Sequence, residues 1–105
     1  MARQAKGEGR VLVRKREQLK APGLWKVLLH NDDYTTQDFV VWLLKTVFRK
    51  PEPEAVAIML AVHRSGMGVA GTYTRDVAET RAERARRLAE QEGFPLLCTV
   101  EEDHA

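Results

Sequence analysis

A continuous apolar run, Ala55 to Val62, is the feature that most constrains the fold of this chain. Pro53 before it suits the first turn of a helix and Gly66 after it supplies a left-handed stop, so about Glu54 to Ser65 is predicted to be helical. Apolar atoms surround most of the circumference of such a helix, and we therefore expect it to be sandwiched between other elements. The run is eight residues long, far below the roughly 18 that a membrane-spanning helix needs.

One helix is predicted before this run and another after it. Thr35 can cap the first, with Asp38 three residues on as a weaker capping box, and Pro51 ends it. Its apolar residues recur at helical spacing: Phe39, Val40, Leu43, Leu44, Val47 and Phe48. The last helix, capped by Thr74, extends to about Glu92. Its buried stripe is expected to be mostly alanine, so that it can lie close to a sheet: Val77, Ala78, Ala82, Ala85, Leu88 and Ala89.

Three segments rich in branched and aromatic residues predict strands: Leu24 to Asn31, Gly68 to Thr74 and Leu96 to Glu101. Gly93 separates the last helix from the last strand. The order is strand, helix, helix, strand, helix, strand, in a chain of 105 residues that has room for one domain. We expect an α+β fold, a small and mainly antiparallel three-stranded sheet covered on one face by three helices.

The first 22 residues differ from the rest of the chain in charge. They hold seven basic and two acidic residues, net +5, whereas residues 23–105 hold ten basic and thirteen acidic residues, net −3. With one short apolar group, Val11 to Val13, they bury too little surface to offset the entropy cost of ordering. We expect residues 1–22 to be a flexible basic amino-terminal arm, either a solubilising tail or an interaction arm, and residues 23–105 to be the folded domain.

The single cysteine, Cys98, allows no internal disulfide, and the first residues lack the apolar segment of a secretory signal. The simplest location is therefore a reducing cytoplasm. Cys98 itself is expected to be a small buried residue rather than a nucleophile.

Residues from separate segments combine into a candidate binding site. The acidic turn Asn31-Asp32-Asp33 offers oxygen acceptors, and Met59 and His63 share one helix face because they are four residues apart. Val40, just after the turn, can face the same space. Carboxylates attract an ammonium group, and Asn31 and a neutral His63 can accept its protons. The set suits a free α-amino group on a chain that begins with a bulky apolar residue.

Each of these residues also has a structural interpretation. The acidic cluster is a common turn sequence, Met59 is a typical core filler, and His63 suits the carboxyl end of a helix. His30 is expected to be a polar strand residue without a role. A metal site from the two aspartates and His63 is weakly indicated, because no paired-ligand spacing is present. From the residues alone these alternatives stay open.

Four ordered blocks resemble the signature segments of ClpS, the adaptor family of the ClpA and ClpC AAA+ proteases. The blocks are Leu28 to Thr35, Met59 to His63, Val77 to Thr80 and Pro95 to Thr99. The match covers essentially all of residues 24–102 in one register. The family's fold is similar to the carboxy-terminal domain of the ribosomal stalk protein.

The resemblance implies an adaptor that recognises N-degrons, substrates beginning with Leu, Phe, Tyr or Trp, and delivers them to the unfoldase for degradation by ClpP. Asn31, Asp33 and His63 would hold the α-amino group, with Asp32 beside them. The side-chain pocket would be lined by Leu29, Thr35, Val40, Met59, Val62 and Leu96. The amino-terminal domain of the unfoldase would contact Asp76, Glu79 and Arg81, and the arm would engage the unfoldase pore. The resemblance implies a monomeric chain without enzymatic activity. It implies no cofactor, no metal, and no nucleic-acid or membrane partner.

One departure from the family concerns Gln37. Family members commonly have Pro-Met where this chain has Thr36-Gln37, and that Met guards the pocket against β-branched side chains. Gln37 is therefore a pocket residue that can change whether Ile and Val are excluded as first residues. Binding of the α-amino group itself is expected to be retained.

Two other classes of function remain as alternatives. A ribosome- or RNA-associated module would use the basic arm and would show a steep salt dependence. An Asp/His hydrolase is less favoured, because no nucleophile is placed for activation. For the adaptor, we expect peptide affinity to fall below about pH 6, where imidazole protonates, and above about pH 8, where the amine loses its charge.

Overall fold

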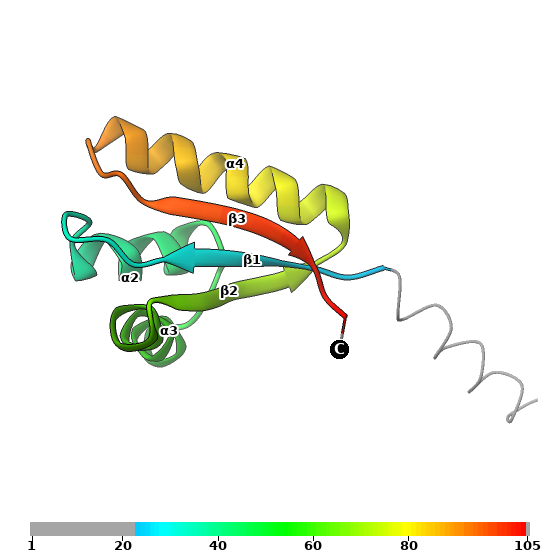
Figure 1. Ribbon diagram of the computed structural model, residues 1–105, viewed down its shortest axis with the longest axis horizontal. Helices are drawn as coiled ribbons and strands as arrows, with labels where there is room; N and C mark the ends of the chain where they lie inside the picture. Colours follow the sequence, from blue (N-terminus) through cyan, green and yellow to red (C-terminus); the bar gives the residue numbers. More distant parts are fainter. Residues whose placement is uncertain (1–22, 105) are drawn as a thin grey trace, which may run out of the picture.

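The computed structural model describes residues 23–104 of the chain (Figure 1). The elements are, in order, β1 (Trp25–His30), α2 (Gln37–Thr46), α3 (Glu52–Ser65), β2 (Met67–Tyr73), α4 (Arg75–Gln91) and β3 (Leu97–Glu102). This order confirms the predicted α+β arrangement, and the bounds of each strand lie within one residue of those expected. The predicted arm over residues 1–22 lies outside the described residues.

β1 is the central strand of the sheet and pairs antiparallel with β2 on one side and with β3 on the other. The three helices lie against one face of this sheet, with α4 along β3 and α3 beside β2 (Figure 1). Val27 and Leu29 point into the core between the layers. Met67 and Leu97, which pair with His30 in the two outer strands, are about half exposed.

The turn before α2 uses two neighbouring threonines differently. Thr36 is the N-cap of α2, and its hydroxyl accepts a hydrogen bond from the backbone N–H of Phe39 at 3.1 Å. The prediction that Thr35 caps this helix is wrong, because the Thr35 hydroxyl instead donates to the Asp32 carboxylate at 2.8 Å. The choice between the two residues therefore depends on a contact within the preceding loop.

α3 begins at Glu52, two residues earlier than predicted, and ends at Gly66, whose φ of 90° confirms the left-handed stop. The prediction that this helix is sandwiched holds only in part, because α3 packs against α2 and β2 but leaves one side exposed. Its buried residues are Ala55, Met59 and Val62, and Val56, Ile58 and Leu60 are partly buried against the core. Ala57 and Ala61 are exposed, because α3 lies at the edge of the molecule. Among the elements within residues 23–104, it packs extensively only against α2 and β2. Small apolar side chains cost little to leave in water.

β2 and α3 approach each other closely at Gly68. A Cβ atom at this position would lie 2.8 Å from Cγ2 of Val62, which is shorter than a van der Waals contact. Glycine therefore allows the first half of β2 to lie against the last turns of α3.

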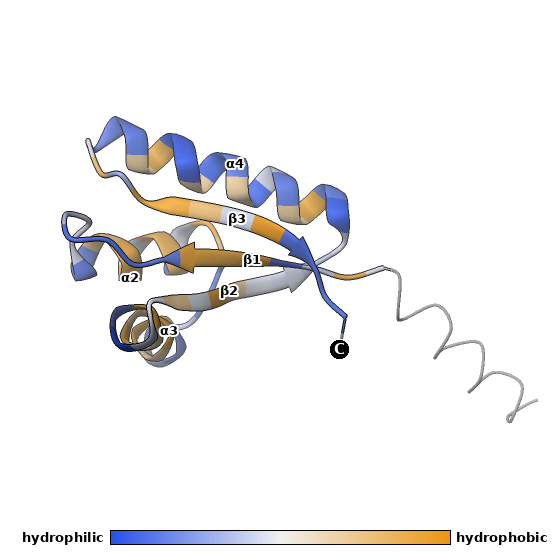
Figure 2. Cartoon of the chain, in the orientation of Figure 1, coloured by the Kyte–Doolittle hydropathy of each residue, from blue (hydrophilic) through white to orange (hydrophobic). Residues whose placement is uncertain are grey.

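α4 covers the sheet with a stripe of small residues, as predicted: Ala78, Ala82, Ala85 and Ala89 are buried. Figure 2 shows this helix as hydrophilic outside and more apolar toward the sheet. Val77 departs from the prediction, because it lies at the flank of the stripe and is 39% exposed. Gly93 ends the segment with a φ of 77°, and none of the helices within residues 23–104 is long and apolar enough to span a membrane.

Candidate binding site between β1, α2 and α3

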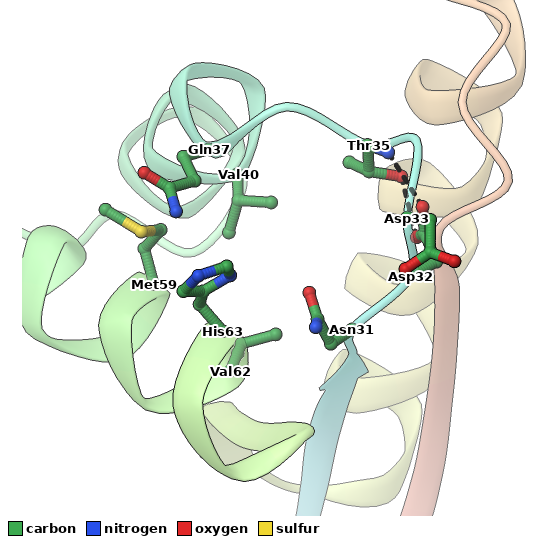
Figure 3. Close-up of a pocket in the computed structure, with 9 residues that line it drawn as sticks. All are labelled: Asn31, Asp32, Asp33, Thr35, Gln37, Val40, Met59, Val62 and His63. Atoms are coloured by element: carbon green, nitrogen blue, oxygen red, sulfur yellow. Dashed lines mark hydrogen bonds between the residues drawn. The ribbon is translucent and has the colours of Figure 1, made fainter.

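A hollow of about 250 Å³ opens where β1 ends, between α2 and α3 (Figure 3). The loop after β1 supplies its polar side and the two helices supply its apolar wall. The lining residues are Asn31, Asp32, Asp33, Thr35, Gln37, Val40, Met59, Val62 and His63. All nine are residues that the sequence predicted at the site. A cavity of about 150 Å³ already accommodates a benzene molecule, so this hollow has room for one large apolar side chain.

The carboxylate of Asp32 stabilises the loop through hydrogen bonds, so its oxygens are not free to bind a ligand in the hollow. Its Oδ1 accepts hydrogen bonds from the backbone N–H groups of Tyr34 at 2.8 Å and Thr35 at 2.7 Å, and its Oδ2 accepts from the Thr35 hydroxyl. Desolvation by burial acts to raise the pKa of the Asp32 carboxyl, but these hydrogen bonds outweigh it, so the pKa lies below its ordinary value. The carboxylate stays ionised and holds the turn.

Asp33 has the opposite character. Its side chain is exposed and makes no hydrogen bond or ion pair with any other residue in the described part of the chain. Adjacent aspartates thus have separate roles, since one forms the loop and the other keeps its oxygens available. The Asp33 carboxylate therefore remains available to pair with a cation.

Asn31 and His63 face each other across the mouth because the main chain ties their elements together. The backbone N–H of Asn31 donates to the carbonyl of Gly66, the C-cap of α3, at 2.9 Å. This bond fixes the end of β1 to the end of α3, one turn beyond His63. In Figure 3 the Asn31 side chain extends into the space between the acidic loop and the His63 ring. Both side chains are exposed and can act as hydrogen-bond acceptors.

The apolar wall comes from both helices. Val40 on α2 and Met59 and Val62 on α3 are buried in the core yet line the hollow. Gln37, in the first turn of α2, is exposed and places a polar amide beside Met59 at the edge of the wall (Figure 3). The hollow therefore has an acidic, acceptor-rich side and an apolar side.

Leu29 and Leu96, two of the predicted pocket residues, are buried and belong to the hydrophobic core, but they do not line the hollow.

Two further residues singled out in the sequence lie within the sheet. His30 has a hydrogen-bond partner there, because its Nε2 atom lies 2.8 Å from the hydroxyl oxygen of Thr99. Cys98 is buried as expected, and desolvation raises the pKa of its thiol to about 11 although Arg86 opposes the shift. The neutral thiol is a poor nucleophile.

The three predicted unfoldase contacts on α4 differ in exposure. Asp76 and Glu79 are exposed, and Glu79 pairs with Arg75 at 3.4 Å. Arg81 is half-buried, and it donates to the carbonyl of Val47 and lies over the Tyr73 ring.

This arrangement is suited to binding a cation attached to an apolar group. Within residues 23–104, no group of three or more His, Cys, Asp or Glu side chains could hold a metal ion. The polar side of the hollow has acceptors and a carboxylate, which are the partners of an ammonium group.

A family model described as ATP-dependent Clp protease adaptor protein ClpS matches residues 20–99. The chain belongs to the ClpS family. ClpS of Desulfatibacillum aliphaticivorans is 53% identical to it over 93 residues, which cover 89% of each chain. ClpS of Deinococcus radiodurans is 54% identical over 94 residues, covering 90% of this chain and 83% of the relative. The resemblance seen in the sequence blocks is thereby confirmed, and it favours an adaptor over a hydrolase.

Among solved structures, Agrobacterium tumefaciens ClpS2 bound to L-phenylalaninamide superposes with a TM-score of 0.75 at 45% sequence identity. The match covers 78% of this chain and 99% of that one. The ClpS fold therefore extends over the described domain.

Proposed function

We propose that this chain binds proteins that begin with Leu, Phe, Tyr or Trp and delivers them to a ClpA- or ClpC-type unfoldase for degradation by ClpP. The observation that carries the proposal is the mouth of the hollow. Asn31, Asp33 and His63 lie around this mouth, and the wall behind it is apolar. A free α-amino group and the first side chain are the two features of such a substrate that have complementary partners here.

In this proposal the ammonium group lies beside the Asp33 carboxylate and donates to the Asn31 carbonyl and to neutral His63. The first side chain enters the hollow against Val40 and Met59. Burying that side chain contributes about 1.5 to 3 kcal/mol, and each hydrogen bond to the charged amine contributes about 1.5 to 3 kcal/mol more. The sum before entropic costs is sufficient for roughly micromolar affinity.

The structural neighbour supports this assignment through its ligand. L-phenylalaninamide, bound by the Agrobacterium tumefaciens protein, combines a free α-amino group with a benzyl side chain and an amide in place of the next residue. It has the same two features that the hollow of this chain complements.

The decisive experiment measures binding of fluorescent peptides that differ only at the first residue. We expect a Leu-first or Phe-first peptide to bind, and the same peptide with an acetylated amino terminus to lose binding. A Gly-first peptide serves as the control for the apolar wall. Equal affinity for the free and the acetylated peptide would refute the amine site.

Delivery requires a second surface, which we assign to α4 through Asp76, Glu79 and Arg81, with residues 1–22 engaging the unfoldase. Deleting residues 1–22 should leave peptide affinity unchanged while lowering the rate of substrate degradation by the unfoldase and ClpP. Unchanged degradation by the shortened chain would remove the arm from the mechanism. The cytoplasmic location and the monomeric state stay predictions.

A further inference from the structure

Exposed apolar side chains lie together on the face of the sheet that is turned away from the helices. On β1, Val27 and Leu29 point into the core. Side chains alternate along a strand, so Leu28 and His30 point to the opposite face. Their partners on β2 and β3 share that face, and three of these partners are exposed apolar residues: Met67, Val69 and Leu97. We call these three side chains, together with Leu28, the apolar patch.

The apolar patch is a concentrated feature of the surface. It holds three of the six large apolar side chains that are exposed within residues 23–104. Leu28, on the central strand, is only 4% exposed although it is not part of the core between the sheet and the helices. Polar groups beside the patch satisfy each other, since Nε2 of His30 lies 2.8 Å from the hydroxyl oxygen of Thr99. Such a surface is suited to an apolar occupant.

The end of the sheet where the described chain begins is acidic. The carbonyl of Leu24 accepts a hydrogen bond from the backbone N–H of Asp103 at 3.0 Å, so the first described residues lie beside the end of β3. Glu101, Glu102 and Asp103 follow one another there. Glu101 pairs with Lys26 on the face of the apolar patch, where its carboxylate lies 3.8 Å from the Lys26 Nζ atom. An exposed ion pair of this kind is weak, so Glu101 can exchange Lys26 for another cation.

The sequence of residues 1–22, which precede this end, is complementary to it. Their longest run of large apolar residues, Val11 to Val13, is followed directly by Arg14, Lys15 and Arg16. Val13 is eleven positions before Leu24, and that length of chain spans up to roughly 36 Å when extended. β1 has six residues and is therefore about 20 Å long. The apolar run can reach the patch while the basic residues after it reach the acidic end of the sheet.

We propose that Val11, Leu12 and Val13 dock on the apolar patch, with the basic residues that follow them placed beside the acidic end of β3. By itself the arm buries too little apolar surface to offset its ordering entropy, and the patch supplies the missing surface. Because the arm and the patch belong to one chain, the contact forms at an effective concentration in the millimolar range, which populates even a weak contact. The patch shares no residue with the lining of the hollow, so docking leaves the amine site open.

The test is methyl NMR of the full chain with labelled methionine, leucine and valine. Met67 reports on the apolar patch, whereas Met59 lines the hollow and reports on peptide binding. We expect nuclear Overhauser contacts between the methyl groups of residues 11–13 and those of Met67 and Leu97, and we expect salt to weaken them. Absence of these contacts at low salt would overturn the proposal.

Leu12→Asp tests the arm without altering the folded domain. A charge in the apolar run should abolish the contacts and shift the Met67 methyl signal, while the Met59 signal stays where it is. Ala5→Asp is the matched control, because it makes the same change of charge elsewhere in the arm, and it should retain the contacts. Loss of the contacts in both variants would show that net charge alone holds the arm, and the apolar docking would be wrong.

Two exposed valines provide a matched pair on the folded domain. Val69 in the patch and Val77 on α4 are 43% and 39% exposed. Val69→Lys should remove the arm contacts and Val77→Lys should keep them. A Met67 signal that moves with protein concentration but not with Leu12→Asp would show that a second copy covers the patch, which contradicts the proposal. A Leu-first peptide should shift the Met59 signal in every variant, so that failure of the amine site is seen separately.

Discussion

Asp32 and Asp33 show that neighbouring residues of one type can carry different functions. Asp32 accepts three hydrogen bonds within its own loop, whereas Asp33 presents an exposed carboxylate at the mouth of the hollow. The sequence predicted that both belong to the amine site, and both do line the hollow. The direction of the backbone through the turn decides which of the two carboxylates is free for a ligand. Residue type alone does not encode that direction.

Replacing each aspartate by asparagine should therefore give different results. Asp33→Asn removes the charge that faces the substrate amine and should weaken binding of a Leu-first peptide by about tenfold to a hundredfold, with no change in stability. Asp32→Asn replaces a charged acceptor with a weaker one and should lower the free energy of unfolding by about 1 kcal/mol, because solvent partly compensates at this half-buried site. Fluorescence anisotropy and urea denaturation measure the two effects. Identical behaviour of both variants would contradict this division of roles.

The thiol of Cys98 should be inert in the folded chain. Burial raises its pKa to about 11 from an ordinary value of 9.0, so at pH 8 the thiolate fraction is about a hundredfold smaller than in the unfolded chain. Labelling with a thiol-specific reagent should be slow in buffer and fast in concentrated urea. Rapid labelling of the native chain would show that this strand opens readily.

At the scale of elements, the caps explain where the sequence prediction succeeded and where it failed. Gly66 has the left-handed conformation predicted for it, and Gly93, predicted to end α4, has the same conformation, because few other residues adopt it without strain. Thr35 and Thr36 could not be separated by type, since either can cap a helix. The exposed side of α3 was also missed, because hydrophobicity around a helix does not report how many neighbours it has.

The N-cap threonines offer a matched pair for experiment. The Thr36 hydroxyl accepts a hydrogen bond from Phe39, whereas Thr74, at the start of α4, makes no side-chain cap bond. Thr36→Ala should therefore lower the free energy of unfolding by about 1 kcal/mol, and Thr74→Ala should lower it by clearly less. Chemical denaturation of both variants tests the difference. A larger loss for Thr74→Ala would contradict the assigned caps.

At the scale of the whole molecule, stability should be highest between about pH 5 and pH 8. The folded-state pKa of Asp32 is below its ordinary value of 3.8, so its contribution is present above that value and is lost as the pH falls through the folded pKa. Desolvation by burial raises the pKa values of Cys98 and, against the charge of Arg81, of Tyr73. The folded chain then binds more protons than the unfolded one at alkaline pH, and stability falls as the pH rises above about 9.

Urea denaturation at a series of pH values measures both the loss of stability at acid pH and the loss at alkaline pH. Asp32→Asn should flatten the acid limb, and Cys98→Ala should reduce the alkaline loss, to which the thiol contributes on the order of 2 kcal/mol. A profile that stays flat up to pH 11 would show that neither buried group resists ionisation.

The family resemblance supplied Thr35, Gln37 and Val62 among the residues that line the hollow, whereas the sequence by itself determined the order of the elements, the alanine stripe of α4 and the other six lining residues. These properties are encoded locally, through periodicity, helix stops and the spacing of side chains on one face. Tertiary structure alone decided which threonine caps α2 and which aspartate keeps its oxygens free. Each of these outcomes is a competition among equivalent groups for one partner, and the winner depends on the path of the backbone through the loop before α2, which residue type does not encode.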